Sequence, residues 1–336
     1  MTLAKAVTLA AVCTELSGEG AIALQRRETV PLRPAAVRVA VRAASVNFPD
    51  VLMIRGLYQT RLEPPFVPGT ECAGVITEVG DDVSGLRVGD RVLTVSGSGA
   101  FATEVVVTPP LNQVHRIPDT MSWAEAASFN ITYGTGIHGL LRRGGLRAGE
   151  SVVVLGAGGG CGSAAVQIAK AAGATVIAVA GGAQKCELAR NLGADAVLDH
   201  HTLGSLSQAV KDHTEGRGAN VVFDTVGGPD VREPLRSLAW NGRYLVIGFA
   251  SGDIPAIRSN QTILKGISIV GVAYGMAAVI DPRANVEDFT QLFDWYRQGK
   301  VTPAIGHRFA LADIAEAMRV VSERRALGKV VIEMPQ

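Results

Sequence analysis

The sequence predicts an α/β protein in which a β-rich domain is split by an inserted domain containing a doubly wound parallel sheet. Three stretches of the chain support this prediction. Short strands separated by turns dominate the first part, buried strands alternate with helices from about residue 125, and a mixed pattern returns after about residue 265. The length of 336 residues also favours two domains, because a single hydrophobic core seldom organises so long a chain.

The first part of the chain carries the pattern of half-buried strands. Residues Ala36–Ala44 read AVRVAVRAA, in which apolar and polar side chains alternate with a period near two. Turn-forming clusters at residues 80–82 (GDD) and 88–90 (VGD) separate further short runs. These runs are Cys72–Val79, Arg91–Val95 and Thr103–Val107. Several short strands with such punctuation are typical of a barrel or a sandwich.

The middle of the chain alternates strands with helices. The predicted strands are Val152–Leu155, Thr175–Val179, Ala196–Leu198, Val221–Phe223 and Tyr244–Ile247. A helix is predicted between the first two strands at Ser163–Ala172, and Gly173 provides its C-terminal cap. This alternation indicates parallel strands joined by crossover helices.

The last part of the chain returns to the β-rich domain in this prediction. Two amphipathic helices, near Glu287–Gln298 and Leu311–Arg324, precede a final strand at Lys329–Ile332. We therefore expect residues 1–126 and 265–336 to form the β-rich domain and residues 127–264 to form the inserted domain.

Charge and cysteine content exclude several classes of protein. The 32 Lys and Arg side chains nearly balance the 31 Asp and Glu side chains, so no general attraction to nucleic acid or acidic membranes is expected. The four cysteines are scattered, with no two at C-x-x-C spacing. Scattered thiols in a long chain favour a reducing compartment, and we expect a cytoplasmic protein.

Two apolar segments resemble membrane or export signals. The uncharged segment Ser151–Ala169 is nearly long enough to span a bilayer. It divides into a Val-rich run, a glycine cluster and an Ala/Ile stretch, which predicts a strand, a loop and a helix instead. The apolar run Ala6–Thr14 resembles a weak signal sequence, but no clear small-residue cleavage site follows it. We therefore predict neither export nor membrane insertion.

The strongest local motif is VVVLGAGGGCGSAAVQIAK, residues 152–170. A buried strand runs into a glycine cluster and then directly into a helix. Glycines permit a tight turn and let the backbone approach a pyrophosphate, while the helix N-terminus offers N–H groups to the phosphates. The motif predicts a dinucleotide site, with contacts from Gly158, Gly159, Gly160, Cys161 and Gly162. A thiolate could be stabilised at Cys161, but we prefer to interpret it as a small packing residue.

The segment after the second predicted strand favours NADPH over NADH. An NAD site usually carries Asp or Glu about 20 residues after the glycines. Residues 178–186 read AVAGGAQKC and contain no acid. Gly181 and Gly182 leave room for the 2′-phosphate of NADPH, and Lys185 can supply positive charge to it. The alternative is that Lys185 is an ordinary exposed lysine of the next helix.

These segments, in this order and spacing, resemble the zinc-free quinone oxidoreductase (zeta-crystallin-like) branch of the medium-chain dehydrogenase/reductase superfamily. The resemblance covers essentially the whole chain. The matching segments are residues 44–58 (ASVNFPDVLMIRGLY), 68–79 (PGTECAGVITEV), 88–92 (VGDRV), 132–140 (TYGTGIHGL), 156–162 (GAGGGCG), 224–227 (DTVG), 264–271 (LKGISIVG) and 328–331 (GKVV). The resemblance implies a GroES-like catalytic domain split by an inserted Rossmann domain, with an active-site cleft between them.

The resemblance also implies further contacts with the cofactor. Asn47 and Thr135 match residues that border the nicotinamide ribose and carboxamide, and both are candidate catalytic residues. Lys185 falls on the family's 2′-phosphate lysine. His200 falls where relatives often carry a Tyr beside that phosphate, and a surface histidine is the alternative. The remaining implied contacts are Phe249, Gly271, Val272 and Lys329.

The ligand positions of the zinc-containing relatives carry other residues in this sequence. The segment that holds a Cys ligand reads SVNFPD at residues 45–50, and the segment GHE reads GTE at residues 69–71. No cysteine lies between residues 72 and 161, and the six histidines are scattered. Tetrahedral zinc needs three or four closely placed Cys, His or carboxylate ligands. We therefore predict no metal site.

Hydride transfer without zinc predicts a conjugated acceptor. An alcohol dehydrogenase of this superfamily uses zinc to stabilise alkoxide charge. A quinone or an enone needs less polarisation, because conjugation delocalises the developing charge. The protein must hold nicotinamide C4 against the acceptor and exclude water. Tyr58 falls on a Tyr that many relatives keep near the cleft, so it is the candidate hydrogen-bond donor; a loop tyrosine that covers the barrel is the alternative.

The sequence leaves two other functions open. One is an NADPH-dependent reductase of 2-alkenals or enoyl thioesters, which would share the fold, the cofactor and the hydride step. The other is an NADPH-binding protein with little turnover, as in crystallin-like relatives. The resemblance further suggests a homodimer in which the last Rossmann strand, near Ile267–Val272, pairs across a two-fold axis. The uncharged run Gly266–Ile280 is consistent with such a covered edge, and its burial in the core is the alternative.

Overall fold

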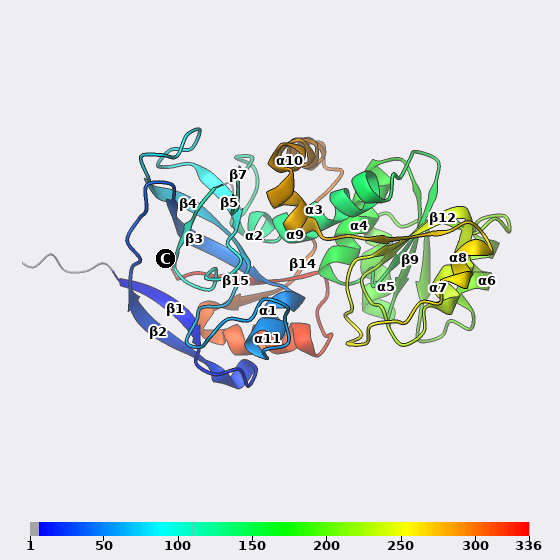
Figure 1. Cartoon of the computed structure of the whole chain (residues 1–336), viewed down its shortest axis with the longest axis horizontal. Coiled ribbons are helices and arrows are strands. Elements are labelled where there is room, and N and C mark those ends of the chain that lie inside the picture. The colour runs from blue at the N-terminus through cyan, green and yellow to red at the C-terminus, as the bar shows by residue number, and fades with distance from the viewer. Residues whose placement is uncertain (1–6, 110, 336) are drawn as a thin grey trace, which may run out of the picture. The chain divides into compact units, whose positions relative to one another are not determined.

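The computed structural model describes residues 7–109 and 111–335 and divides into two compact units (Figure 1). The first unit comprises the chain up to Asn130 and from Ile305 onward, and the second comprises Ile131–Ala304. The first unit is therefore discontinuous in sequence, as expected for a domain that carries an insertion.

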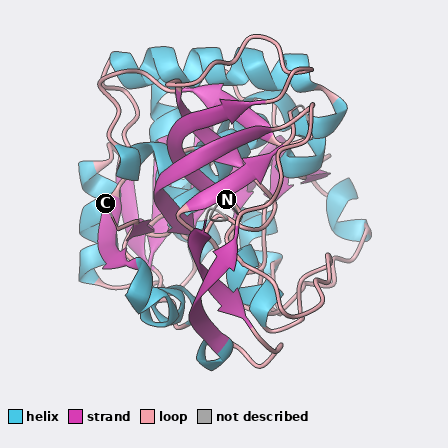
Figure 2. Ribbon diagram, turned by 90° about the vertical axis from the view of Figure 1, so that its left-hand side faces the viewer, coloured by secondary structure: helices cyan, strands magenta, loops and turns pink. Residues whose placement is uncertain are grey.

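The described residues of the first unit form a seven-stranded sheet, the twist of which is visible in Figure 2. The strand order is β14–β15–β3–β4–β5–β7, and β6 pairs with the first half of β3. Neighbouring strands are antiparallel except for the parallel pair β14–β15. The bounds are β3 Val37–Val46, β4 Glu71–Val79, β5 Arg91–Val95, β6 Glu104–Val107, β7 Gln113–Arg116, β14 Ile305–Ala310 and β15 Lys329–Glu333.

A separate antiparallel hairpin precedes this sheet. It consists of β1 (Val7–Cys13) and β2 (Ile22–Glu28), joined through a short 3₁₀ helix at Glu19–Ala21. The second half of β1, Ala10–Cys13, is buried in the core of the unit. The apolar run that resembled a signal sequence therefore forms a strand over residues 7–13, buried in its second half, and Ala6 lies outside the described residues.

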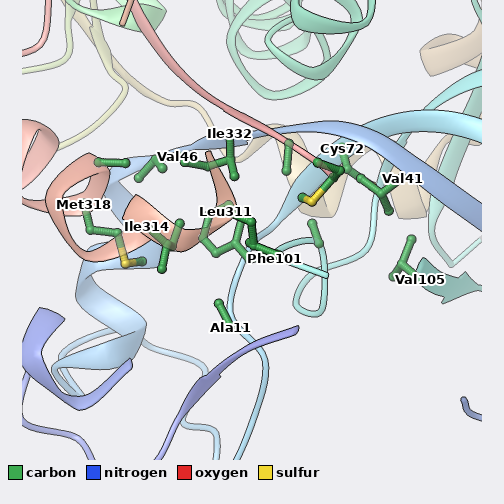
Figure 3. Close-up of a cluster of buried hydrophobic side chains, with 14 of the residues drawn as sticks. Ala11, Val41, Val46, Cys72, Phe101, Val105, Leu311, Ile314, Met318 and Ile332 are labelled. Atoms are coloured by element: carbon green, nitrogen blue, oxygen red, sulfur yellow. The ribbon is translucent and has the colours of Figure 1, made fainter. Parts of the chain in front are cut away.

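The core of the first unit lies between the sheet and two helices, α1 (Phe48–Ile54) and α11 (Ile314–Ser322). Four side chains on one face of α11 are buried, because their spacing follows the helical period: Ile314, Ala317, Met318 and Val320. They meet Phe101 and apolar side chains of the strands (Figure 3). Two further short helices belong to this unit, a 3₁₀ turn at Leu311–Asp313 and α2 (Trp123–Ala127).

The second unit contains a six-stranded parallel sheet with the order β10–β9–β8–β11–β12–β13. In chain order this is 3-2-1-4-5-6, the order of a doubly wound dinucleotide-binding sheet. The strands are β8 Ser151–Leu155, β9 Thr175–Ala180, β10 Ala196–Asp199, β11 Ala219–Asp224, β12 Leu238–Val246 and β13 Ser268–Gly271. The helices are α3 Asn130–Ile137, a π-helical segment His138–Arg143, α4 Gly160–Ala171, α5 Ala183–Asn191, α6 Leu206–Asp212, α7 Arg232–Ser237, α8 Asn260–Ile263, α9 Tyr274–Ile280 and α10 Pro282–Arg297.

The predicted elements are present, but the domain boundary differs. Residues 265–304 were expected in the β-rich domain, whereas the structure places them in the second unit. The reason is long-range pairing: β13 extends the parallel sheet by pairing with β12. In addition, Asp288 of α10 accepts a hydrogen bond of 2.7 Å from Arg142 of the π-helical segment.

The segment Ser151–Ala169 forms β8, the glycine loop and most of α4, as predicted. None of the helices in the described ranges combines the length and the apolar character needed to cross a membrane.

Candidate functional site

The glycine cluster after β8 forms a tight loop that leads into α4. Gly156 has a φ of 77°, a left-handed conformation that favours glycine. A Cβ at Gly162 would lie 2.1 Å from the carbonyl oxygen of Gly156, so loop and helix approach more closely than any side chain would allow. The N-cap of α4 is Gly159, and no side chain caps this helix end. The loop therefore fits a dinucleotide pyrophosphate at the predicted residues 158–162.

Residues that follow β11 support this loop. The Thr225 hydroxyl donates a hydrogen bond of 2.9 Å to the carbonyl oxygen of Leu155, the last residue of β8. The carboxylate of Asp224 accepts from two backbone N–H groups of the following turn and from the hydroxyl of Tyr244. In the sequence, residues 224–227 stood out only as a family motif; their support of the loop depends on β11 lying beside β8 in the sheet.

Lys185 and His200 pack against two glycines of the predicted dinucleotide site. A Cβ at Gly158 would lie 2.5 Å from the Cβ of Lys185, so the lysine stem lies across the glycine loop. A Cβ at Gly181 would lie 2.3 Å from Cε1 of His200. The imidazole of His201 lies 4.3 Å from that of His200, measured between ring centroids. The structure thus brings four predicted residues to the carboxyl ends of β8, β9 and β10: Gly158, Gly181, Lys185 and His200.

An acidic residue also reaches this place, from the neighbouring strand. The Asp199 carboxylate accepts hydrogen bonds of 3.0 Å from the backbone N–H groups of Gly182 and His201. These two hydrogen bonds lower the pKa of Asp199, so it is ionised at neutral pH. Asp199 lies outside residues 178–186, the stretch from which the choice of cofactor was predicted. The signal was present, because carboxyl ends of adjacent parallel strands meet at one edge of a sheet.

Except for Thr135, which lies in α3, the other predicted dinucleotide residues of this unit follow the same edge of the sheet. Thr135 and Cys161 are half-buried in α3 and in the first turn of α4. Phe249 is half-buried in the loop after β12, and Gly271 and Val272 lie at the end of β13. Ligands of open parallel sheets bind at the carboxyl ends of the strands. The placement of these residues is therefore compatible with their predicted role.

In the first unit, Asn47 belongs to a buried polar group that also contains Ser45, Asp50, Glu71 and Lys329, here called the Lys329 cluster. β3 lies between β15 and β4, so residues near its end meet side chains from both neighbours. The Lys329 ammonium donates to Asn47 Oδ1 at 2.7 Å and to Glu71 Oε1 at 3.0 Å. The same Glu71 oxygen accepts from Asn47 Nδ2 at 2.9 Å and from the Ser45 hydroxyl at 2.6 Å.

Asp50 is the fully buried acid of this cluster. Its Oδ2 accepts a hydrogen bond of 2.7 Å from the backbone N–H of Asn47, the N-cap of α1. Burial raises the pKa of Asp50 from its ordinary 3.8 to about 7. This contact makes Asp50 a structural hydrogen-bond partner of Asn47.

The zinc-ligand positions of related dehydrogenases do not fit a zinc ion in this chain. Asn47 and Thr70 offer a neutral amide and a hydroxyl, which are poor zinc ligands. The Lys329 ammonium already neutralises the nearby Glu71 carboxylate, and it would repel a metal ion beside it. Within the ranges that the structure describes, no group of three or more His, Cys, Asp and Glu side chains is arranged to hold a metal.

Two other predicted site residues of the first unit, Lys329 and Tyr58, lie in surroundings unlike each other. Lys329, expected near the cofactor, is 4 % exposed and directs its ammonium into the cluster. Tyr58 is half-buried in the loop after α1, next to the exposed Leu57. Asn47 and Lys329 were predicted as separate cofactor contacts, whereas in the structure they bind each other within the Lys329 cluster.

Comparison with known proteins identifies the family. The family model described as an alcohol dehydrogenase GroES-like domain matches residues 33–119, and the model described as a zinc-binding dehydrogenase matches residues 160–297. The chain is 38 % identical over 329 residues to a quinone oxidoreductase-like protein 2 homolog of Nematostella vectensis, covering 97 % of this chain and 89 % of that protein.

Solved structures agree with this assignment. A probable oxidoreductase from Mycobacterium abscessus is 34 % identical, with a TM-score of 0.89 and coverage of 98 % of this chain and 100 % of that one. A mycobacterial protein solved in complex with NADPH is 27 % identical, with a TM-score of 0.89 and coverage of 97 % and 99 %. The predicted fold class, a GroES-like domain with an inserted Rossmann domain, is confirmed. This chain belongs to the medium-chain dehydrogenase/reductase superfamily, in its quinone oxidoreductase branch.

Proposed function

We propose that this protein is a cytoplasmic oxidoreductase that uses NADPH to transfer a hydride to a quinone or a similar conjugated carbonyl compound, without zinc. The observation that carries the choice of cofactor is the position of Lys185, the stem of which crosses the glycine loop beside Gly158. The observation that supports a metal-free reaction is the buried Lys329 ammonium between Asn47 and Glu71.

Different residues would bind the cofactor and the hydride acceptor. The glycine loop and the start of α4 would bind the pyrophosphate, and Lys185 would attract the 2′-phosphate, with His200 beside it. Thr135 and Asn47 would hold the nicotinamide end. When bound, NADPH supplies the hydride from nicotinamide C4. Tyr58 would donate a hydrogen bond to the acceptor oxygen as negative charge develops there.

The position of Asp199 argues against NADPH as the cofactor, since a carboxylate near the ribose is typical of NAD sites. Its Oδ1 is already occupied by two backbone N–H donors at 3.0 Å, which hold the turn at Gly182. We therefore assign Asp199 to the shape of the turn and Lys185 to the choice of cofactor.

The proposed reaction is tested by loss of NADPH absorbance with purified protein of known metal content. A quinone and a simple enone are compared as acceptors, and NADPH and NADH as donors. We expect turnover with the quinone, a preference for NADPH, and no effect of a chelator. Turnover with the enone alone would assign the protein to the alkenal or enoyl reductases instead. Tight NADPH binding without turnover of either acceptor would favour the binding protein with little turnover.

We also propose a homodimer formed along β13. This strand is at the edge of the parallel sheet, and edge strands invite pairing with another chain. Large apolar side chains are exposed on and after it, including Ile269, Met276 and Ile280. Sedimentation equilibrium is expected to give twice the chain mass of 35.1 kDa, and Ile269→Lys is expected to shift the protein toward the monomer. A monomer mass for the unaltered protein at all concentrations would reject this proposal.

A further inference from the structure

The Lys329 cluster carries charges that the stability of the fold does not require. Lys329 is 4 % exposed and Glu71 is 1 % exposed, so both charged groups have lost nearly all contact with water. The desolvation of a buried ion pair offsets much of its attraction, and well-packed apolar side chains often replace such a pair without loss of stability. The presence of this pair across β3, between Lys329 of β15 and Glu71 of β4, therefore suggests a role other than stability.

The pair fixes the orientation of one neutral side chain. Asn47 Oδ1 accepts from the Lys329 ammonium, and Asn47 Nδ2 donates to the Glu71 carboxylate. A rotation of the amide by 180° would place its NH₂ group against the ammonium and its carbonyl oxygen against the carboxylate. Both contacts would then be repulsive. A cation on one side and an anion on the other thus select a single orientation of the amide.

The selected orientation leaves Asn47 with spare hydrogen-bonding capacity. A carboxamide has two N–H donors and two acceptor lone pairs. The short contacts in the cluster use one donor, at 2.9 Å to Glu71, and one lone pair, at 2.7 Å to Lys329. The remaining Nδ2 contacts, to Ser45 and Thr70, are both 3.4 Å long and weak. The second Nδ2 donor is therefore engaged only weakly and can bind a ligand.

We propose that Lys329 is a positioning residue that, together with Glu71, holds the Asn47 carboxamide in the single orientation required to bind the reactants. The identity of those reactants rests on the proposed function, whereas the orientation of Asn47 does not. Lys329 itself needs no contact with the cofactor or the acceptor. Its effect on the reaction passes through Asn47.

The central experiment removes both charges at once. Lys329→Met alone leaves the Glu71 carboxylate buried and uncompensated, so this variant can fail to fold. The double variant Lys329→Met/Glu71→Gln removes both charges and keeps a side-chain oxygen that accepts from Asn47. It is expected to fold, with a thermal midpoint within about 5 °C of the unaltered protein. Its kcat is expected to fall by about 10-fold to 100-fold, with a KM for NADPH changed by less than about 3-fold.

The matched control is an exposed ion pair that links β14 to β15, the strand of Lys329. Arg308 and Glu333 form a 2.7 Å pair with side chains about half exposed, and Glu333 belongs to β15 like Lys329. Arg308→Met/Glu333→Gln is expected to leave kcat and KM unchanged. If the Lys329→Met/Glu71→Gln variant also keeps an unchanged kcat, the buried pair is only structural and the proposal is overturned.

A comparison with Asn47→Ala tests whether Lys329 acts through Asn47. Once Asn47 has been replaced by Ala, the additional Lys329→Met/Glu71→Gln change is expected to lower kcat no further, because nothing remains to be oriented. Losses that multiply would show that Lys329 acts independently of Asn47, which contradicts the proposal.

A measurement without turnover separates this inference from the proposed function. The side-chain NH₂ signals of Asn47 can be assigned by their disappearance in Asn47→Ala in an ¹⁵N–¹H spectrum of the full chain. We expect these signals to move in Lys329→Met/Glu71→Gln and to stay unchanged in Arg308→Met/Glu333→Gln. Unmoved signals would overturn the orientation argument even in an active enzyme. Moved signals in a protein that reduces no conjugated acceptor would uphold it while rejecting the proposed function.

Discussion

Replacing Asp50 by Asn is expected to remove a large pH dependence from the stability of this protein. Asp50 is fully buried, and its pKa in the folded protein is about 7, against an ordinary value of 3.8. Its Oδ1 has no hydrogen-bond partner among the described residues, and the cost of burying the charge outweighs the Asn47 N–H hydrogen bond and the Lys329 charge, which favour the ionised form. The folded chain therefore keeps the proton at pH values where the unfolded chain has lost it.

The direction of the effect follows from this difference in bound protons. Between about pH 4 and pH 7 the folded state binds more protons at Asp50 than the unfolded state does, so the free energy of unfolding falls as the pH rises. The contribution of the buried Asp50 proton to the free energy of unfolding is fully present below about pH 4 and is lost as the pH rises through about 7. The difference between 3.8 and about 7 corresponds to about 4 kcal/mol in total.

Urea unfolding of both proteins at several pH values measures this contribution. Because other carboxylates also titrate, the informative quantity is the stability of the unaltered protein minus that of Asp50→Asn. This quantity is expected to shrink by about 3 kcal/mol between pH 5 and pH 8. The control is Asp81→Asn, since Asp81 is exposed, and its stability curve should follow that of the unaltered protein. Parallel curves for the unaltered protein and Asp50→Asn would show that Asp50 is ionised throughout.

Replacing Lys185 by Glu is expected to weaken NADPH binding by about 100-fold, with much less effect on NADH. The change removes the attraction between Lys185 and the predicted 2′-phosphate and replaces it with a repulsion. In a partly exposed site these two effects together are worth about 3 kcal/mol. Lys185→Met, which keeps the stem that crosses Gly158, should lose about 10-fold by removing the charge alone.

The affinities of 2′,5′-ADP and 5′-AMP, measured by calorimetry, test this without any turnover. The two ligands differ only by the 2′-phosphate, so the ratio of their dissociation constants isolates that group. Arg190→Met serves as the control, because Arg190 lies on the same helix and pairs with Glu187. An equal loss for both ligands in Lys185→Met would mean that Lys185 acts only by packing on the glycine loop, and the choice of NADPH would lose its main support.

The unit that carries the glycine loop is the part that the sequence predicted best. The run VVVL, the glycines at 156–162 and the following Ala/Ile stretch lie within 20 residues of one another, and each has a local physical signature. Period, turn chemistry and helix capping are properties of neighbouring residues, so strands, loop and helix could be predicted before any long-range contact was known. The family motifs then indicated a Rossmann domain inserted into a GroES-like domain.

By itself, then, the sequence determined the fold class, the glycine loop and the strands that carry it, because these depend on residues close together in the chain. Only the tertiary structure decided which distant residues meet. It placed Lys329 on Asn47 across a separation of 282 positions and brought Asp199 to the turn at Gly182. Such contacts depend on strand register and on the burial of charge, which local periodicity does not specify.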